Sequence, residues 1–144
     1  MQYAWLVDAA QGFRSSGNAR FRLFAHLVLV TKYRRRVLTG PMLDRCREIL
    51  ARLCETWDCT LIECSGEPDH VHALLDLPPK VRPSDLINLL KTVSSRLLRS
   101  EYPALRADYR GKPVLWSPSY FLVSAGGAPI EIIRRYIEQQ EKPG

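Results

Sequence analysis

Apolar and polar positions follow two different periods along the chain, and the changes of period predict the order of its elements. A dense run of apolar and β-branched residues over 21–31 predicts a central strand. Apolar residues then recur at helical spacing from Leu43 to Trp57, after Thr39 and Pro41, which are typical of a helix start. This pattern indicates an amphipathic helix that packs on a sheet.

The middle of the chain predicts a hairpin followed by a second helix. Residues 60–66 and 70–77 form two strand-like runs, and the turn-forming residues 66–69 lie between them. Pro83 and Ser84 then begin a helix. Its apolar stripe consists of Leu86, Leu90, Val93 and Leu97.

The last third predicts one more strand and one more helix. Residues 102–112 are polar and indicate a connection without regular structure. Residues 113–123, which are rich in aromatic side chains, predict a fourth strand. Gly126 and Gly127 indicate a hinge, and a helix is expected from Pro129 through about Gln140.

The order strand, helix, strand, strand, helix, strand predicts an α+β fold. We expect a ferredoxin-like (RRM-like) β-α-β-β-α-β antiparallel sheet with helices on one face. A chain of 144 residues suits one compact domain. We assign residues 1–20 to an N-terminal arm and 21–144 to a single domain, whose C-terminal helix covers about 128–141.

The charge balance is basic, with 21 Lys and Arg against 15 Asp and Glu and a formal net charge of +6. A polyanionic partner is consistent with this balance. Basic and polar residues gather in the turn after the first strand, on one face of the second helix and in the last helix. The residues that we expect to contact nucleic-acid phosphates are Lys32, Arg34, Arg35, Arg36, Asn88, Lys91, Ser95, Arg99, Arg134 and Arg135. A charged helix face that is simply solvated remains the alternative.

The cysteine spacing and the hydropathy of the chain argue against a zinc-ribbon protein, a secreted protein and a membrane protein. No two of the four cysteines form a C-x-x-C pair, which argues against a zinc ribbon. Cys46 and Cys54 fall on the apolar face of the first helix, where we expect reduced core thiols. We find no signal peptide and no run near the roughly 18 apolar residues of a membrane span. We therefore expect a cytoplasmic protein without a membrane partner.

Two histidines stand two residues apart in the third strand. Side chains alternate along a strand, so His70 and His72 point to the same face. Two imidazoles on one face can fill two coordination positions of a divalent metal ion. The alternative is a pair of polar residues on a solvated face. His26 lies within an apolar strand, and we interpret it as a hydrogen-bonded core residue without a chemical role.

The last helix contains a second pair of functional groups. Tyr136 and Gln140 are four residues apart and therefore share a helix face. The neighbouring stripe of Ile130, Ile133 and Ile137 would dock this helix. From this spacing alone, a surface tyrosine beside a surface glutamine is the favoured interpretation.

Four separated segments together carry a resemblance to a known family. They are Lys32-Tyr33-Arg34, residues 67–75 around His70-Val71-His72, residues 115–120 and residues 135–140. In this order and at these intervals, the chain resembles the HUH single-tyrosine transposases of the smallest bacterial and archaeal insertion sequences, the TnpA-like proteins. HUH denotes two histidines around a hydrophobic residue, here Val71. The resemblance covers about residues 21–140.

The resemblance implies a specific chemistry. His70, His72 and Gln140 would bind Mg²⁺ or Mn²⁺, and Tyr136 would be the nucleophile that cuts and rejoins single-stranded DNA through a 5′-phosphotyrosine. Residues 125–128 would form the joint of the tyrosine helix. Family members recognise imperfect hairpins and are usually homodimers with active sites shared between subunits, so both properties are expected here.

Three other functions are also consistent with the sequence. One is a domesticated relative, similar to the tyrosine transposases associated with repeated extragenic palindromes, that acts on host palindromes. Another is a non-catalytic module of ferredoxin-like fold that binds single-stranded nucleic acid. The last is a metal-dependent phosphodiesterase that uses water as the nucleophile.

Overall fold

A computed structural model of the chain describes residues 15–16, 19–20, 23–124, 135 and 137–139. Two short strands, β1 (Ser15–Ser16) and β2 (Ala19–Arg20), pair with each other antiparallel. The elements of the main body are β3 (Leu23–Val30), η1 (Lys32–Arg34), α2 (Gly40–Thr56), β4 (Thr60–Glu67), β5 (His70–Leu77), α3 (Pro83–Glu101), α4 (Pro103–Asp108) and β6 (Phe121–Ser124).

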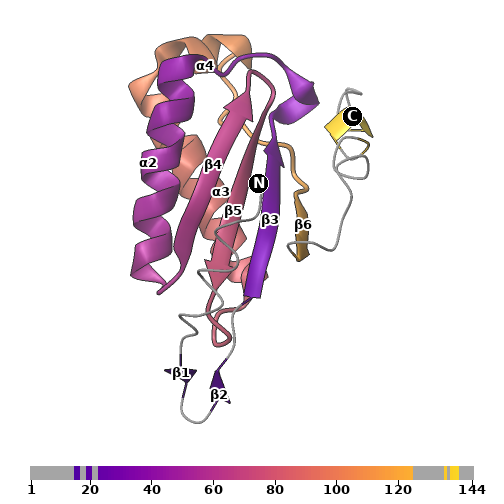
Figure 1. Cartoon of the computed structure of the whole chain (residues 1–144). Helices are drawn as coiled ribbons and strands as arrows, with labels where there is room; N and C mark the ends of the chain where they lie inside the picture. Colours follow the sequence, from indigo (N-terminus) through magenta and orange to yellow (C-terminus); the bar gives the residue numbers. More distant parts are fainter. Residues whose placement is uncertain (1–14, 17–18, 21–22, 125–134, 136, 140–144) are drawn as a thin grey trace.

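The four strands of the main body form one antiparallel sheet in the order β4-β5-β3-β6. The helices α2 and α3 pack against each other and lie on one side of this sheet (Figure 1). This is the ferredoxin-like β-α-β-β-α-β arrangement, and it confirms the predicted α+β fold. The sheet order puts β3 and β5 at the centre.

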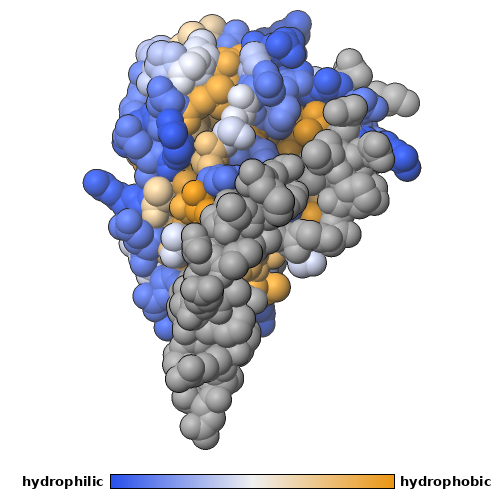
Figure 2. Space-filling model, viewed as in Figure 1, coloured by the Kyte–Doolittle hydropathy of each residue, from blue (hydrophilic) through white to orange (hydrophobic). Residues whose placement is uncertain are grey.

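Alternation along the central strands separates the two faces of the sheet. Ala25, Leu27 and Leu29 of β3 belong to the hydrophobic core with the helices, as do Val71 and Ala73 of β5. The intervening residues therefore point to the opposite face. Figure 2 shows hydrophobic side chains in the middle of the visible surface, between hydrophilic ones.

Helix α2 begins and packs as its sequence predicts. The Thr39 hydroxyl accepts a hydrogen bond from the Met42 backbone N–H at 3.4 Å, and Pro41 lies in the first turn. Cys46 and Cys54 are free thiols that are fully buried on the core side. The expectation of reduced core cysteines at these two positions is confirmed.

The predicted polar connection over 102–112 is wrong, because residues 103–108 form the helix α4. Pro103 lies in its first turn, and Leu105 is fully buried in the core. One buried leucine among polar residues gives too weak a period for the sequence to predict this short helix.

The predicted strand over 113–123 is also wrong in most of its length, since regular pairing occupies only β6. The preceding residues contact the end of β3 through an isolated bridge between Thr31 and Trp116. Pro113 and Pro118 lack the N–H donors that a continuous ladder needs. Trp116 is buried, and its indole N–H donates to the Ser94 hydroxyl at 2.9 Å, so it packs in the fold.

Helix α3 also turns a slightly different face to the core than its apolar stripe predicts. Leu86 and Leu90 are fully buried as expected, but Leu98 is buried where Leu97 is expected, and Ser94 is buried on the same helix. The Trp116 indole requires a polar partner, and Ser94 supplies it from within this face.

Two of the expected segments lie largely outside the described residues. They are the N-terminal arm over 1–20 and the C-terminal helix over about 128–141. Within the latter, residues 135 and 137–139 are described and are helical, whereas Tyr136 and Gln140 lie outside the described part. Among the described residues, no helix has the length and apolar character to cross a membrane.

Candidate functional site

His70 and His72 point to the same face of the sheet from the first residues of the strand β5. In the register with β3, His70 pairs with Val30 and His72 pairs with Val28. Both imidazoles therefore lie on the face opposite the helices, as the alternation predicts. Each imidazole has a hydrogen-bond partner of its own.

The His70 imidazole is held by the residue before it. Its Nδ1 lies 2.9 Å from Oδ1 of Asp69, whose second oxygen accepts from Arg34 Nε at 2.7 Å. Burial would raise the pKa of the Asp69 carboxyl, but the hydrogen bonds from Arg34 and His70 outweigh burial and lower it. If His70 donates its Nδ1 proton to the ionised Asp69, the neutral ring keeps a lone pair on Nε2.

The turn after β3 places the Arg34 side chain beside the Asp69 carboxylate. Tyr33 and Arg34 both have left-handed backbones, with φ of 61° and 54°. This conformation costs energy for residues with a Cβ, so the surroundings must hold it. The Lys32 N–H donates to the Leu115 carbonyl at 2.8 Å, and the Thr31 hydroxyl donates to the Arg35 carbonyl at 2.7 Å.

The His72 imidazole is held across the sheet by His26. Nδ1 of His26 lies 2.9 Å from Nε2 of His72, and the two rings are nearly parallel, with an angle of 16° between their planes. Burial lowers the pKa of both imidazoles, which favours their neutral forms. Neutral imidazole is the form that binds metals.

The sequence-based interpretation of His26 needs correction. The residue is buried and hydrogen-bonded as expected, but it lies on the face of His72 and not among the core residues between sheet and helices. The sequence could not show this contact, because it depends on the register between β3 and β5. The sequence showed only that a polar residue, His26, stands in an otherwise apolar strand.

The two imidazoles fit a divalent metal site in their chemistry. Among the described residues, His70 and His72 each have one ring nitrogen with a protein partner, and no described side chain bonds to the other nitrogen. Within the part of the chain that the structure describes, no three His, Cys, Asp or Glu side chains are placed to hold a metal together. The pair thus needs a ligand of another type or from another part, and the expected third ligand, Gln140, lies outside the described residues.

Several residues expected at a nucleic-acid surface have contacts within the fold. The Lys91 ammonium donates to the carbonyls of Ser117 at 2.8 Å and Pro118 at 2.9 Å, and burial lowers its pKa. Ser95 is buried and accepts from Arg99 Nε at 3.1 Å. Arg34 has its partner in Asp69 as described above. The structure therefore gives Lys91, Ser95 and Arg34 structural contacts, whereas Arg36 and Asn88 are exposed.

Arg35 also has internal contacts. A guanidinium nitrogen of Arg35 donates to the Asp108 carbonyl, and the group lies over the Tyr109 ring at 5.2 Å from its centroid. The Tyr109 hydroxyl in turn donates to the Lys32 carbonyl at 3.0 Å. These contacts tie the basic turn to the end of α4. Arg134 lies outside the described residues, and Arg135 is exposed.

A second concentration of basic groups lies on the helix side of the fold. A hollow of about 280 Å³ between α3 and α4 is lined by Arg96, Arg99 and Arg106, with Ser100 and Pro103. No ion pair joins any of these three guanidinium groups to an acid in the described part of the chain. The adjacent Glu101 pairs with another arginine, Arg45, at 2.8 Å.

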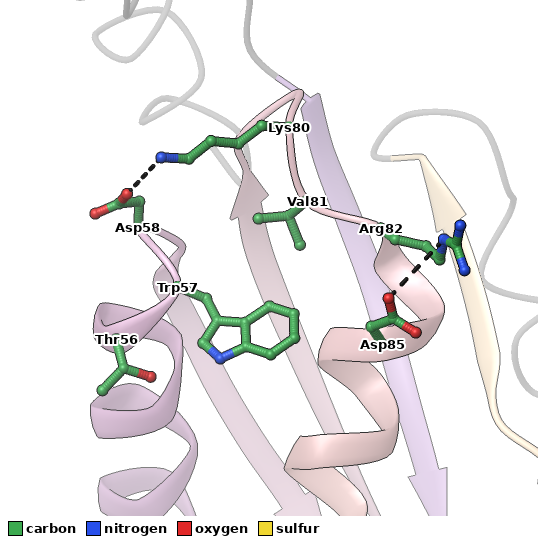
Figure 3. A pocket seen from close by; sticks show the side chains of 7 residues that line it. All are labelled: Thr56, Trp57, Asp58, Lys80, Val81, Arg82 and Asp85. Atoms are coloured by element: carbon green, nitrogen blue, oxygen red, sulfur yellow. Dashed lines mark hydrogen bonds and ion pairs between the residues drawn. The ribbon is translucent and has the colours of Figure 1, made fainter.

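A larger hollow of about 580 Å³ lies where α2 ends and α3 begins (Figure 3). Its charged residues pair with one another, since Lys80 contacts Asp58 at 2.8 Å and Arg82 contacts Asp85 at 3.9 Å. It adjoins the end of β5 that is remote from His70. Its compensated charges and its location give it no part in the site around the histidines.

Comparison with known proteins identifies a matching family. The model of the family described as "Transposase IS200 like" matches residues 19–140. The ISDra2 transposase TnpA of Deinococcus radiodurans is 33% identical over 120 residues, which cover 83% of this chain and 85% of that protein. The transposase of insertion sequence element IS200 from Salmonella typhimurium is 31% identical over 127 residues, covering 88% and 82%.

Solved structures give the same result for the fold. The crystal structure of a protein described as a transposase from Deinococcus radiodurans superposes with a TM-score of 0.82 at 30% identity, covering 90% of this chain and 98% of that one. A REP-associated tyrosine transposase bound to a REP hairpin superposes with a TM-score of 0.51 at 13% identity, covering 86% and 69%. This second likeness concerns the fold alone.

Proposed function

Because the chain belongs to the IS200-like transposase family, we propose that it cleaves and rejoins single-stranded DNA through a phosphotyrosine intermediate. The observation that best supports this chemistry is the pair of imidazoles on the sheet face opposite the helices. His70 is held by Asp69 and His72 by His26, so both rings have a fixed orientation. Imidazoles that are oriented by partners of this kind are common ligands of divalent metal ions, and in this proposal a third ligand completes the site.

In this proposal His70, His72 and Gln140 hold Mg²⁺ or Mn²⁺. When bound, the ion supplies a Lewis acid for a nonbridging oxygen of the scissile phosphate. Imidazole and amide ligands are neutral and leave the positive charge available to the phosphate. Nitrogen ligands suit Mn²⁺ somewhat better than Mg²⁺.

Tyr136 is the proposed nucleophile. Its phenol oxygen forms a bond to phosphorus while the bond from phosphorus to the 3′ oxygen breaks, and the 3′ oxygen leaves as a hydroxyl after gaining a proton. A free phenol has a pKa near 10, so the site must promote loss of the phenol proton. The resulting 5′-phosphotyrosine keeps the energy of the broken bond. The 3′-hydroxyl of another strand can attack it, and rejoining then needs no ATP.

The proposed substrate is DNA that is unpaired at the cut and carries imperfect hairpins nearby. Lys32, Arg36, Asn88 and Arg99, with Arg134 and Arg135, are the proposed phosphate contacts. Arg99 is favoured because it shares a hollow with two further arginines that have no acidic partner among the described residues. We also propose a homodimer in which the tyrosine helix of one subunit completes the site of the other.

The test is cleavage of single-stranded oligonucleotides taken from the DNA that flanks the gene. The wild type should form a protein–DNA adduct that resists denaturation when Mn²⁺ or Mg²⁺ is present, and Tyr136→Phe should bind the same DNA without forming it. Tyr120→Phe removes a different phenol hydroxyl and is the matched control. A Tyr136→Phe variant that still cuts would exclude the tyrosine mechanism and favour an activated water.

Binding without cutting would identify the competing function. If the wild type binds hairpins but never cuts with either metal, the chain is a nucleic-acid-binding module. A domesticated relative would cut host palindromes in the same assay, and the DNA that surrounds the gene distinguishes it from a mobile element.

A further inference from the structure

The contact between His26 and His72 also decides which ring nitrogen of His72 is available to a metal. His26 pairs with Leu74 in the register of β3 with β5, and His72 pairs with Val28, so the two histidines are diagonal neighbours on one face. Their facing nitrogens, Nδ1 of His26 and Nε2 of His72, are 2.9 Å apart. This is the distance of a hydrogen bond between ring nitrogens.

Such a bond requires one proton between the two nitrogens. If His72 carries it on Nε2 and donates, its Nδ1 keeps a lone pair. If His26 carries it on Nδ1 and donates, a neutral His72 must hold its own proton on Nδ1, and neither of its nitrogens is then available to a metal. Only the first arrangement makes His72 a ligand.

The surroundings of the pair restrict its geometry. His26 is 9% exposed, and the centroids of the two nearly parallel rings lie 4.9 Å apart. Both residues lie on the two central strands of the sheet, which pair with each other along their whole length. A change of ring orientation would leave a largely buried nitrogen without its partner, which is unfavourable.

We propose that His26 is a positioning residue that accepts a hydrogen bond from Nε2 of His72 and so presents Nδ1 of His72 to the metal. The proposal rests on the metal site of the proposed function. Each of the two ligands is then oriented by a different residue. His26 orients His72, whereas Asp69 bonds to Nδ1 of His70 and leaves Nε2 of His70 for the ion. Supporting partners of this kind typically change metal affinity by about 10–100-fold when they are removed.

The first measurement uses metal-free wild type and needs no DNA. Long-range ¹H–¹⁵N NMR reports which ring nitrogen of each histidine carries the proton. The proposal predicts a proton on Nε2 of His72 and a lone pair on Nδ1 of His26. A proton on Nδ1 of His72 would overturn it.

The second measurement is Mn²⁺ affinity, by calorimetry or electron paramagnetic resonance. His26→Leu removes the acceptor at similar volume and should weaken Mn²⁺ binding about 10–100-fold. His26→Asn places an amide oxygen near the position of Nδ1 and should restore most of the affinity, which a purely space-filling role would not produce. Unchanged or tighter binding by His26→Leu would show that His26 is dispensable or competes with the metal.

These outcomes separate the two proposals. Suppose that the wild type has the predicted tautomer and that His26→Leu loses Mn²⁺ affinity, but that the wild type forms no adduct with DNA. This result would refute the cleavage function and leave the role of His26 intact. Wild type that binds no Mn²⁺ would refute both. If His26→Leu does not fold, the tautomer measured in the wild type still decides the question.

Discussion

Nε of Arg34 lies 2.7 Å from Oδ2 of Asp69, and this ion pair links the left-handed turn after β3 to His70, the first residue of β5. The Asp69 side chain is nearly fully buried and uses its other oxygen for His70. The turn thus forms part of the support of the candidate metal site. Arg34, which the sequence predicted to contact DNA, therefore has a structural partner in Asp69, 35 positions away.

Arg34→Ala should destabilise the fold. The change leaves a largely buried Asp69 carboxylate without its cation, and an unsatisfied buried group costs about 1–3 kcal/mol of unfolding free energy. Arg36→Ala removes an exposed arginine of the same turn and is the control, with an expected change within about 0.5 kcal/mol. Urea unfolding measures both. Equal midpoints for the two variants would show that the contact with Asp69 contributes little.

Gly66→Ala should destabilise the hairpin that presents the histidines. A Cβ at this position would lie 2.6 Å from Cδ2 of Leu43 and 2.8 Å from the backbone oxygen of His70, and the latter cannot move without moving the strand. We expect a decrease of about 1–3 kcal/mol in unfolding free energy, typical of overpacking. Gly40→Ala, where a Cβ meets nothing within 4 Å, is the matched control. If Gly66→Ala unfolds at the same temperature as Gly40→Ala, a Cβ at position 66 does not clash with Leu43 and His70 as expected.

The cysteines should be unreactive in the native protein. Burial raises the pKa of Cys46 to about 12 and that of Cys64 to about 11, so thiolate is scarce in neutral buffer. We expect slow labelling by a thiol reagent in buffer and labelling of all four cysteines in urea. Rapid labelling of Cys46 without denaturant would show that α2 does not pack on the sheet as described.

Arg99→Ala should weaken DNA binding because it removes a proposed phosphate contact. Removal of one such contact lowers the slope of log affinity against log salt by about 0.7 for single strands. Arg47→Ala, which removes an exposed arginine paired with Asp44 on α2, serves as the control. Titration of a labelled oligonucleotide at several salt concentrations gives both slopes. Identical slopes for the two variants would place the DNA away from α3.

Much of the fold follows from the local pattern of the sequence. The alternation at His70 and His72 in β5, the helical period of α2 and the cap at Thr39 each appear in the structure, because each depends on neighbouring residues. The prediction for the segment before β6 failed, since its shape is set by Trp116 reaching Ser94 across the fold. Aromatic residues that favour strands by propensity are there used for packing.

The candidate site was only half predictable for the same reason. Alternation alone places His70 and His72 on one face. The partners that orient them, Asp69 with Arg34 and His26, depend on the turn geometry and on the register of β3 with β5, which no local pattern specifies. Likewise, the engagement of Lys91 by carbonyls of the 117–118 segment follows from tertiary packing.

In the proposed mechanism, the Tyr136 phenol attacks a DNA phosphate beside a metal held by His70 and His72. The most direct test is mass spectrometry of the protein after incubation with single-stranded DNA and Mn²⁺, followed by nuclease and trypsin digestion. We expect a nucleotide on Tyr136, in the tryptic peptide that begins after Arg135, and we expect it to disappear with a chelator or in His72→Ala. A nucleotide on any other residue, or one that forms equally well without metal, would contradict it.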